Sequence, residues 1–126
     1  MAFSRDTTAA NIKPLSGSIV RRYTSGDAIA AGEVVSLQSD GYVDPSDATS
    51  SDEVVGIAIQ AASAAAEVID VVVLGPVKCL LEASPGGTVY NSTTAGEPSQ
   101  TDSGNVTAVG YAESTTVLFV LPERLV

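Results

Sequence analysis

The residues of this chain that could do chemistry are few, and most of them are carboxylates. Five acids crowd the stretch "SDGYVDPSDATSSDE" over residues 39–53: Asp40, Asp44, Asp47, Asp52 and Glu53. Oxygen ligands of this kind are what Ca²⁺ takes in proteins. Their spacing does not match an EF-hand loop, so we expect a solvated acidic loop and no metal site. Whether this loop binds a cation stays open.

Enzymatic chemistry lacks its usual parts here. The 126 residues include no His, which is the commonest general acid and base. Cys79 is the single cysteine and sits in the apolar run "VKCLLEA". Without a His to activate it, we expect this thiol to be a small buried hydrophobe and not a nucleophile. Glycine-containing turns such as "SPGG" do not match a phosphate-binding loop. The sequence therefore predicts no enzyme and no cofactor.

Charge is abundant, strongly acidic and unevenly placed. The net charge is −9, which argues against contact with nucleic acid, because phosphate binding needs clustered Lys and Arg. Residues 1–25 carry four basic residues against one acid, whereas the rest carries two against fourteen. This asymmetry predicts a basic N-terminal part that seeks an acidic partner surface. A solubilising body with a leader of no binding role is the alternative, and it stays open.

The N-terminal stretch shows neither helical nor strand periodicity. "MAFSRDTTAANIKPLSG" lacks the apolar run of an export signal or membrane helix, so we expect synthesis in a cytoplasm and no membrane partner. We predict an extended N-terminal arm over residues 1–17, disordered when free, and a β-rich body over residues 18–126. Phe3 is an apolar residue in a polar arm, with no obvious packing site within its own fold, so we expect it to dock on a partner. The candidate partner-binding residues are Phe3, Arg5, Lys13, Arg21 and Arg22.

Short Val-rich runs separated by Gly, Asp, Ser and Pro make up the body. Examples are "SIVRRYTSGD", "EVVSL", "EVVGIAI" and "TTVLFVLP". This pattern predicts an all-β fold, a small single-domain β-barrel or β-sandwich of short strands. The alanine-rich stretch Gln60–Val68 favours a helix by propensity, but its length allows only a wide turn or one short helix.

Two phrases of the body resemble each other. "GEVVSLQSDGYV" with "EVVGIAI" is echoed by "GGTVYN" with "VTAVGYAE", which aligns Gly32 with Gly87 and Gly56 with Gly110. We expect these glycines at structural turns, or where a strand bulges or meets another backbone closely. The pattern suggests two halves, at about 26–75 and 76–122. Whether they reflect duplication or only a shared Gly-Val composition stays open.

The order of the motifs resembles a known family. The series "SGDAIAAGEVVSL", "EVVGIAI", "EVIDVVVLGPVKCLLEA", "GGTVYN", "AVGYAE" and "STTVLFVLPE" is similar to the capsid decoration, or head cement, proteins of tailed bacteriophages, over roughly Ser18 to Pro122. The resemblance implies a small β-rich protein without enzymatic activity that binds the outside of an icosahedral head, commonly as a trimer. It also implies that the segment from Ala2 to Leu15 orders on the capsid.

Two functions from different classes follow. The first is a virion structural protein on the outer surface of the head. Its partners would be the major capsid protein and itself, as a homotrimer, and its N-terminal arm would clip neighbouring capsid subunits together. The second is an exposed β-barrel module that binds a carbohydrate or a cell-surface component. A module of that kind needs a pocket lined by polar and aromatic residues, and the sequence offers only scattered Tyr and Asn.

Overall fold

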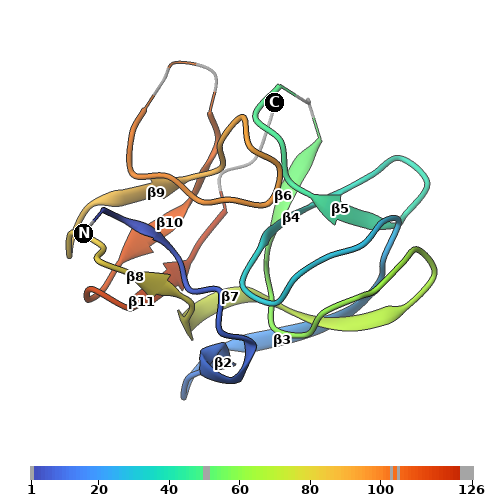
Figure 1. The fold of residues 1–126 in the computed structure, drawn as a ribbon, viewed down its shortest axis with the longest axis horizontal. Helices are drawn as coiled ribbons and strands as arrows, with labels where there is room; N and C mark the ends of the chain where they lie inside the picture. Colours follow the sequence, from blue (N-terminus) through green and yellow to red (C-terminus); the bar gives the residue numbers. More distant parts are fainter. Residues whose placement is uncertain (1, 50–51, 103, 105, 123–126) are drawn as a thin grey trace.

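The computed structural model describes residues 2–49, 52–102, 104 and 106–122, and this part of the chain is all-β. Its paired strands are antiparallel, and the main sheet curls into a half-barrel (Figure 1). The small single-domain all-β fold predicted from the sequence is confirmed. A 3-10 helix, η1 (Ala9–Asn11), lies between the first two strands. The strands are β1 (Ser4–Arg5), β2 (Lys13–Pro14), β3 (Ile19–Thr24), β4 (Val34–Leu37), β5 (Val43–Pro45), β6 (Glu53–Ala58), β7 (Val68–Lys78), β8 (Leu80–Leu81), β9 (Thr88–Tyr90), β10 (Ala108–Ala112) and β11 (Val117–Val120).

The longest strand, β7, joins the two parts of the main sheet. The strand order is β5-β4-β6-β7-β11-β10-β9. The first part of β7 pairs with β6 through Val71 and Val72, and its last part pairs with β11 from Gly75 to Lys78. β3 and then β2 pair along the other edge of β7. β1 and β8 form a separate two-stranded sheet.

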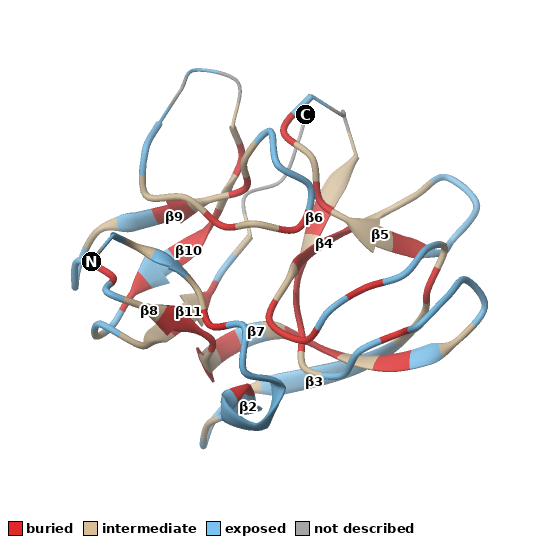
Figure 2. Cartoon of the chain, viewed as in Figure 1, coloured by how far each residue is buried: buried red, intermediate tan, exposed pale blue. Residues whose placement is uncertain are grey.

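The core consists of two apolar clusters that share β7. Val71 and Val72 are adjacent in sequence and both fully buried. Side chains alternate across a strand, so these two point to opposite faces of the sheet, and Val72 joins the larger cluster while Val71 joins the smaller. Figure 2 shows buried segments on the strands of both parts of the sheet. β7 therefore contributes to both clusters.

The two halves of the body share a turn geometry. The N–H of Gly32 donates to the carbonyl of Ala58 at 2.7 Å, and the N–H of Gly86 donates to that of Ala112 at 2.7 Å. Both glycines have left-handed φ values, +91° and +82°, which glycine adopts without steric cost. The structural counterpart of Gly32 is thus Gly86. The alignment of Gly32 with Gly87 was wrong by one residue, and the strand register agrees with the turn, because Val35 pairs with Gly56 as Val89 pairs with Gly110.

Gly56 and Gly110 lie inside strands and not in turns. Gly56 is in β6 and pairs with Val35, while Gly110 is in β10 and pairs with Val89, each next to a shift in register. A Cβ added at Gly56 would collide with the carbonyl oxygen of Val72, and one added at Gly110 would collide with the equivalent oxygen on β11. Both glycines therefore let the following strand approach closely at a bulge.

The N-terminal segment, residues 2–16, is packed on the body. The sequence led us to expect a free extended arm, and the structure differs. β1 pairs with β8, β2 pairs with β7, and Ile12 is buried in the larger apolar cluster. Phe3 packs against the same cluster in the chain by itself, so the ring does have a place within its own fold, and its docking on a partner stays a prediction. Two apolar side chains spaced along a polar stretch, together with the two strand pairings, attach it to the body.

The alanine-rich stretch forms no helix. Ala62 pairs with Ile29 in an isolated bridge, and Ala66 has a left-handed φ of +70°, which stops a helix from continuing. The N–H of Ala66 donates to the carbonyl of Ser25 at 2.7 Å. Backbone pairing with distant residues has overridden the propensity of alanine, and the result is the wide turn that the length allowed.

Substitution of Gly110 by Ala tests the close approach of β10 and β11. The added methyl group would overlap a backbone oxygen, which cannot move without shifting β11, so we expect a loss of about 2 kcal/mol or more in the free energy of unfolding. Urea denaturation measures this loss. Gly41→Ala is the control, because Gly41 has φ +87° but nothing within 4 Å, and we expect only about 1 kcal/mol there. Equal losses at the two positions would contradict the packing at Gly110.

Candidate protein-docking surface

The structure separates the five predicted contact residues into two groups. Phe3 and Arg5 turn toward the body, whereas Lys13, Arg21 and Arg22 are exposed. The exposed three lie on β2 and β3, which are hydrogen-bonded to the same edge of β7. The sequence therefore placed the basic residues on the correct stretch of chain but gave all of them one role, and the structure assigns two.

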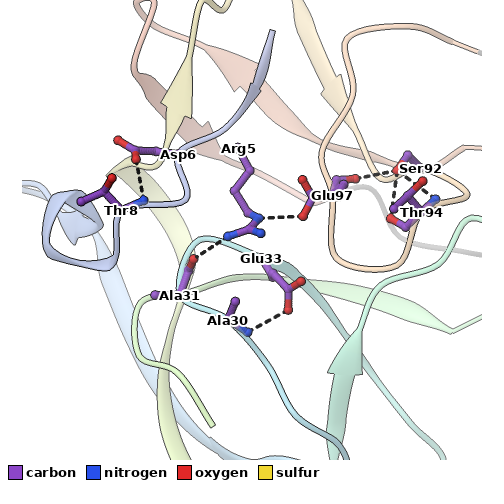
Figure 3. Close-up of polar contacts among 9 residues, drawn as sticks. All are labelled: Arg5, Asp6, Thr8, Ala30, Ala31, Glu33, Ser92, Thr94 and Glu97. Carbon is purple, nitrogen blue, oxygen red and sulfur yellow. Dashed lines mark hydrogen bonds and ion pairs between the residues drawn. The ribbon is translucent and has the colours of Figure 1, made fainter. Parts of the chain in front are cut away.

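Arg5 holds the N-terminal segment to the body (Figure 3). Its Nε donates to Glu97 Oε2 at 2.7 Å, and its Nη1 donates to the carbonyl oxygen of Ala31 at 3.2 Å. The arginine side chain is only 13% exposed. A charge-assisted bond in a partly buried place is stronger than one at the surface. In the chain by itself Arg5 therefore contacts the body, and its contact with a partner stays a prediction.

Asp6 orders the turn that follows. It is buried, and its carboxylate accepts hydrogen bonds from the N–H of Thr8 at 2.9 Å and the amide of Asn11 at 3.1 Å. Its own N–H donates to the carbonyl oxygen of Cys79 at 2.9 Å. Burial raises the pKa of the Cys79 thiol, with a smaller contribution from Asp6, so this thiol stays protonated at neutral pH. Cys79 thus packs in the core, as expected of a buried thiol.

Glu33 lies near Arg5 and is half-buried. Its Oε1 accepts the N–H of Ala30 at 2.8 Å (Figure 3). Burial raises the pKa of Glu33, although the hydrogen bond from Ala30 and the charge of Arg5 both act to lower it. Desolvation of the carboxylate is therefore the largest of these effects.

The outer edge of β3 is open, and we name the residues Ile19, Val20, Arg21 and Arg22 the basic edge. Among the described residues β3 pairs only with β7. The N–H of Ser25 bonds to the carbonyl of Glu67, and bonded pairs alternate along an antiparallel ladder. It follows that the backbone groups of Val20 and Arg22 point away from β7. Figure 2 shows most of β3 as exposed, along the margin of the fold.

Aliphatic side chains accompany these charges. Ile19 is 50% exposed and Val20 is 40% exposed. Arg22 reaches Asp70 at 3.4 Å, but its side chain is 75% exposed, so this pair contributes little stability. Arg21 makes no ion pair within the described ranges. The basic edge thus offers unpaired backbone, apolar area and charge to a partner.

A second polar surface surrounds a hollow at the other end of β3, and we name the residues Asp27, Asp40, Tyr42 and Asp44 the acidic rim. The hollow measures about 280 Å³ and is lined by Asp27, Ser36, Gln38, Asp44, Pro45, Asp47, Asp52 and Ala95. Asp44 Oδ1 is buried without a hydrogen-bond partner. Burial, and after it the charges of Asp27, Asp40 and Asp52, raise the pKa of Asp44. Negative charge is therefore crowded here.

No group of His, Cys, Asp and Glu in the described part of the chain is arranged to hold a metal ion. Asp27 and Asp44 of the acidic rim line the hollow, but the carboxylates there form no coordination shell among the described residues. The cation question raised by the sequence therefore gains no support from the geometry.

A smaller hollow lies near the end of the described chain. It measures about 220 Å³ and is lined by Tyr23, Val54, Val55, Val73 and Pro122. One aromatic ring and four aliphatic residues offer few groups that could orient a sugar. This hollow gives the ligand-binding alternative little support.

The sequence contained a signal for the open edge that composition and periodicity did not reveal. Two successive arginines in a strand place charge on both faces. Only a strand that is exposed on both faces, such as an edge strand, accommodates this arrangement cheaply. The pair Arg21 and Arg22 is thus enough, as sequence alone, to indicate that β3 is an edge strand.

Comparison with known proteins leaves the chain without a family assignment. A scan against models of protein families finds no match, and a search of curated proteins finds no similar sequence. Within the described residues, no helix has the length and apolar character needed to cross a membrane.

The raised pKa of Glu33 gives a pH dependence of known sign. The ordinary pKa of a Glu side chain is 4.5, and the folded protein binds the proton of the Glu33 carboxyl more tightly than the unfolded chain does. Protonation of Glu33 therefore contributes fully to the free energy of unfolding below pH 4.5, and this contribution is lost as the pH rises through the raised pKa. Glu33→Gln keeps an oxygen that can accept the N–H of Ala30. We therefore expect a higher Tm than wild type at pH 7, and a smaller difference at pH 4, in thermal melts. A variant that is less stable than wild type only at pH 7 would contradict this sign.

Proposed function

We propose that this protein is a virion structural protein that binds the outer surface of an icosahedral phage head. It stabilises the head by cross-linking neighbouring capsid subunits, acts as a homotrimer, and uses its N-terminal segment as a clip. The observation that carries the proposal is the basic edge, where an open strand edge, exposed aliphatic side chains and two arginines occur together. Such a surface fits a protein whose work is to contact other proteins.

Two further features support the proposal. The order of the motifs between Ser18 and Pro122 resembles that of phage head decoration proteins. The body carries most of the fifteen acids of the chain, and a strong net charge keeps a protein soluble at the high concentrations that many symmetric copies require.

To act as a clip, the N-terminal segment must detach from the body. Its two strands each span only two residues, and Gly17 behind them has φ +95° with no atom within 4 Å of the point where a Cβ would lie. Against this, Arg5 and Ile12 hold the segment in place. Release therefore costs free energy, which contacts with the capsid repeated over many copies would offset.

Binding to heads tests the proposed function. The purified chain is mixed with expanded, DNA-free heads of the phage that encodes it and sedimented. We expect saturable co-sedimentation and a higher temperature of head disruption, because a ligand that binds only the intact assembly stabilises it. Heads that sediment without the chain at every concentration would overturn the proposal.

A disulfide between β1 and β8 tests the clip separately. Ser4 and Leu81 are directly paired, so Ser4→Cys with Leu81→Cys places two thiols within reach of one another. The native Cys79 is fully buried and does not interfere. We expect the oxidised variant to lose at least about tenfold in affinity for heads, through the loss of the second point of attachment, and the reduced variant to recover it. Equal binding in both states would contradict the clip and leave head binding itself standing.

A further inference from the structure

The basic edge and the acidic rim are complementary surfaces of one chain. The first presents Arg21 and Arg22 beside exposed aliphatic residues. The second presents a hollow lined by Asp27 and Asp44, and Tyr42, which is 41% exposed, lies with Asp44 against Gly26. Each surface thus combines apolar area with charge, and the two charges are opposite in sign.

Within one molecule these surfaces cannot meet. Arg21 lies within β3, whereas Asp27 follows the end of that strand. Six steps along the chain separate the two residues, which is at most roughly 20 Å at the rise of an extended strand. Arg22 reaches Asp70 on the neighbouring strand and no carboxylate of the acidic rim. A partner for each surface must therefore come from another molecule.

Like charges exclude the simplest alternative. If two copies paired through β3 and β3 in an antiparallel register centred on Arg21 and Arg22, the arginines of one copy would lie against those of the other. Like charges directly opposite on paired strands are destabilising. Arginine on an edge strand acts in this way against pairing of identical edges. The arginines thus disfavour a symmetric pair of edges and favour an acidic surface.

We propose that the basic edge of one copy binds the acidic rim of a second copy, so that copies of this chain associate head to tail. Arg21 or Arg22 would enter the hollow beside Asp44 and stack on Tyr42, while Ile19 and Val20 cover the apolar part of the rim. Tyr and Arg are the residues that most often dominate binding between proteins. A contact between two different surfaces closes into a ring when the rotation per copy allows it.

This contact deepens the proposed function and rests on it only for the number of copies, which would be three. It also leaves the first part of the N-terminal segment, where β1 pairs with β8, for the capsid. Self-association is measured without heads, so its failure is distinguishable from a failure of head binding.

Charge reversal tests the contact. The variants are Arg21→Glu with Arg22→Glu, which reverses the basic edge, and Asp27→Lys with Asp40→Lys, which reverses the acidic rim. All four positions are exposed, so both proteins should fold, and circular dichroism checks this. The mass in solution is measured by light scattering over a range of protein concentrations. We expect a closed oligomer for wild type and monomers for each variant alone. When the two variants are combined we expect an open mixed complex in which they alternate, because a ring of three copies cannot alternate two variants.

Two further variants sharpen the test. Tyr42→Ala should weaken association about tenfold, as truncation of a central aromatic residue does. Glu113→Lys, an exposed reversal outside both surfaces, is the matched control and should leave the mass unchanged. A wild-type protein that is monomeric at every concentration, or an oligomer that survives both charge reversals, would overturn the proposal.

Discussion

The structure depends on a single strand, β7, because it pairs with strands from both halves of the sheet and contributes side chains to both apolar clusters. On the edge of β7 away from β3, the neighbouring strand changes from β6 to β11 near Gly75. There φ is +103°, and a Cβ would lie 2.7 Å from the Cα of Ser18. The same strand carries β3 and β2 on its other edge, so the position of the basic edge follows from how β7 runs.

Charge separation follows from this arrangement. β3 begins at the basic edge and leads directly into the acidic rim, so one strand connects two surfaces of opposite sign. The N-terminal segment adds a third element, held by Arg5 through one partly buried ion pair with Glu97. In our proposal this layout serves two kinds of contact, one with copies of the same chain and one with another protein. The hollows, at about 280 and 220 Å³, are small for a ligand-binding module.

How much could be predicted from the sequence depended on whether the signal was local. The all-β fold was predictable, because short Val-rich runs between turn residues are a local pattern. The packing of the N-terminal segment on the body was not predictable. Arg5 and Glu97 are far apart in sequence, and the polar composition of the segment gave no sign that Ile12 would be buried. The alignment of the halves failed by one residue, because Gly86 and Gly87 differ only in backbone conformation, which the sequence does not display. The uneven distribution of charge was visible in the sequence, but the open edge of β3 that carries two of the basic residues was not.

We have proposed that the outer edge of β3 is a docking surface, and amide hydrogen exchange resolved by residue is the direct test. The N–H groups of Val20 and Arg22 point outward, while that of Tyr23 points toward β7 by the same alternation. We predict that in dilute protein Val20 and Arg22 exchange rapidly and Tyr23 slowly, and that in concentrated protein Val20 and Arg22 become slow as well. Rapid exchange at both positions, unchanged in concentrated protein in which the chain has associated, would contradict the account.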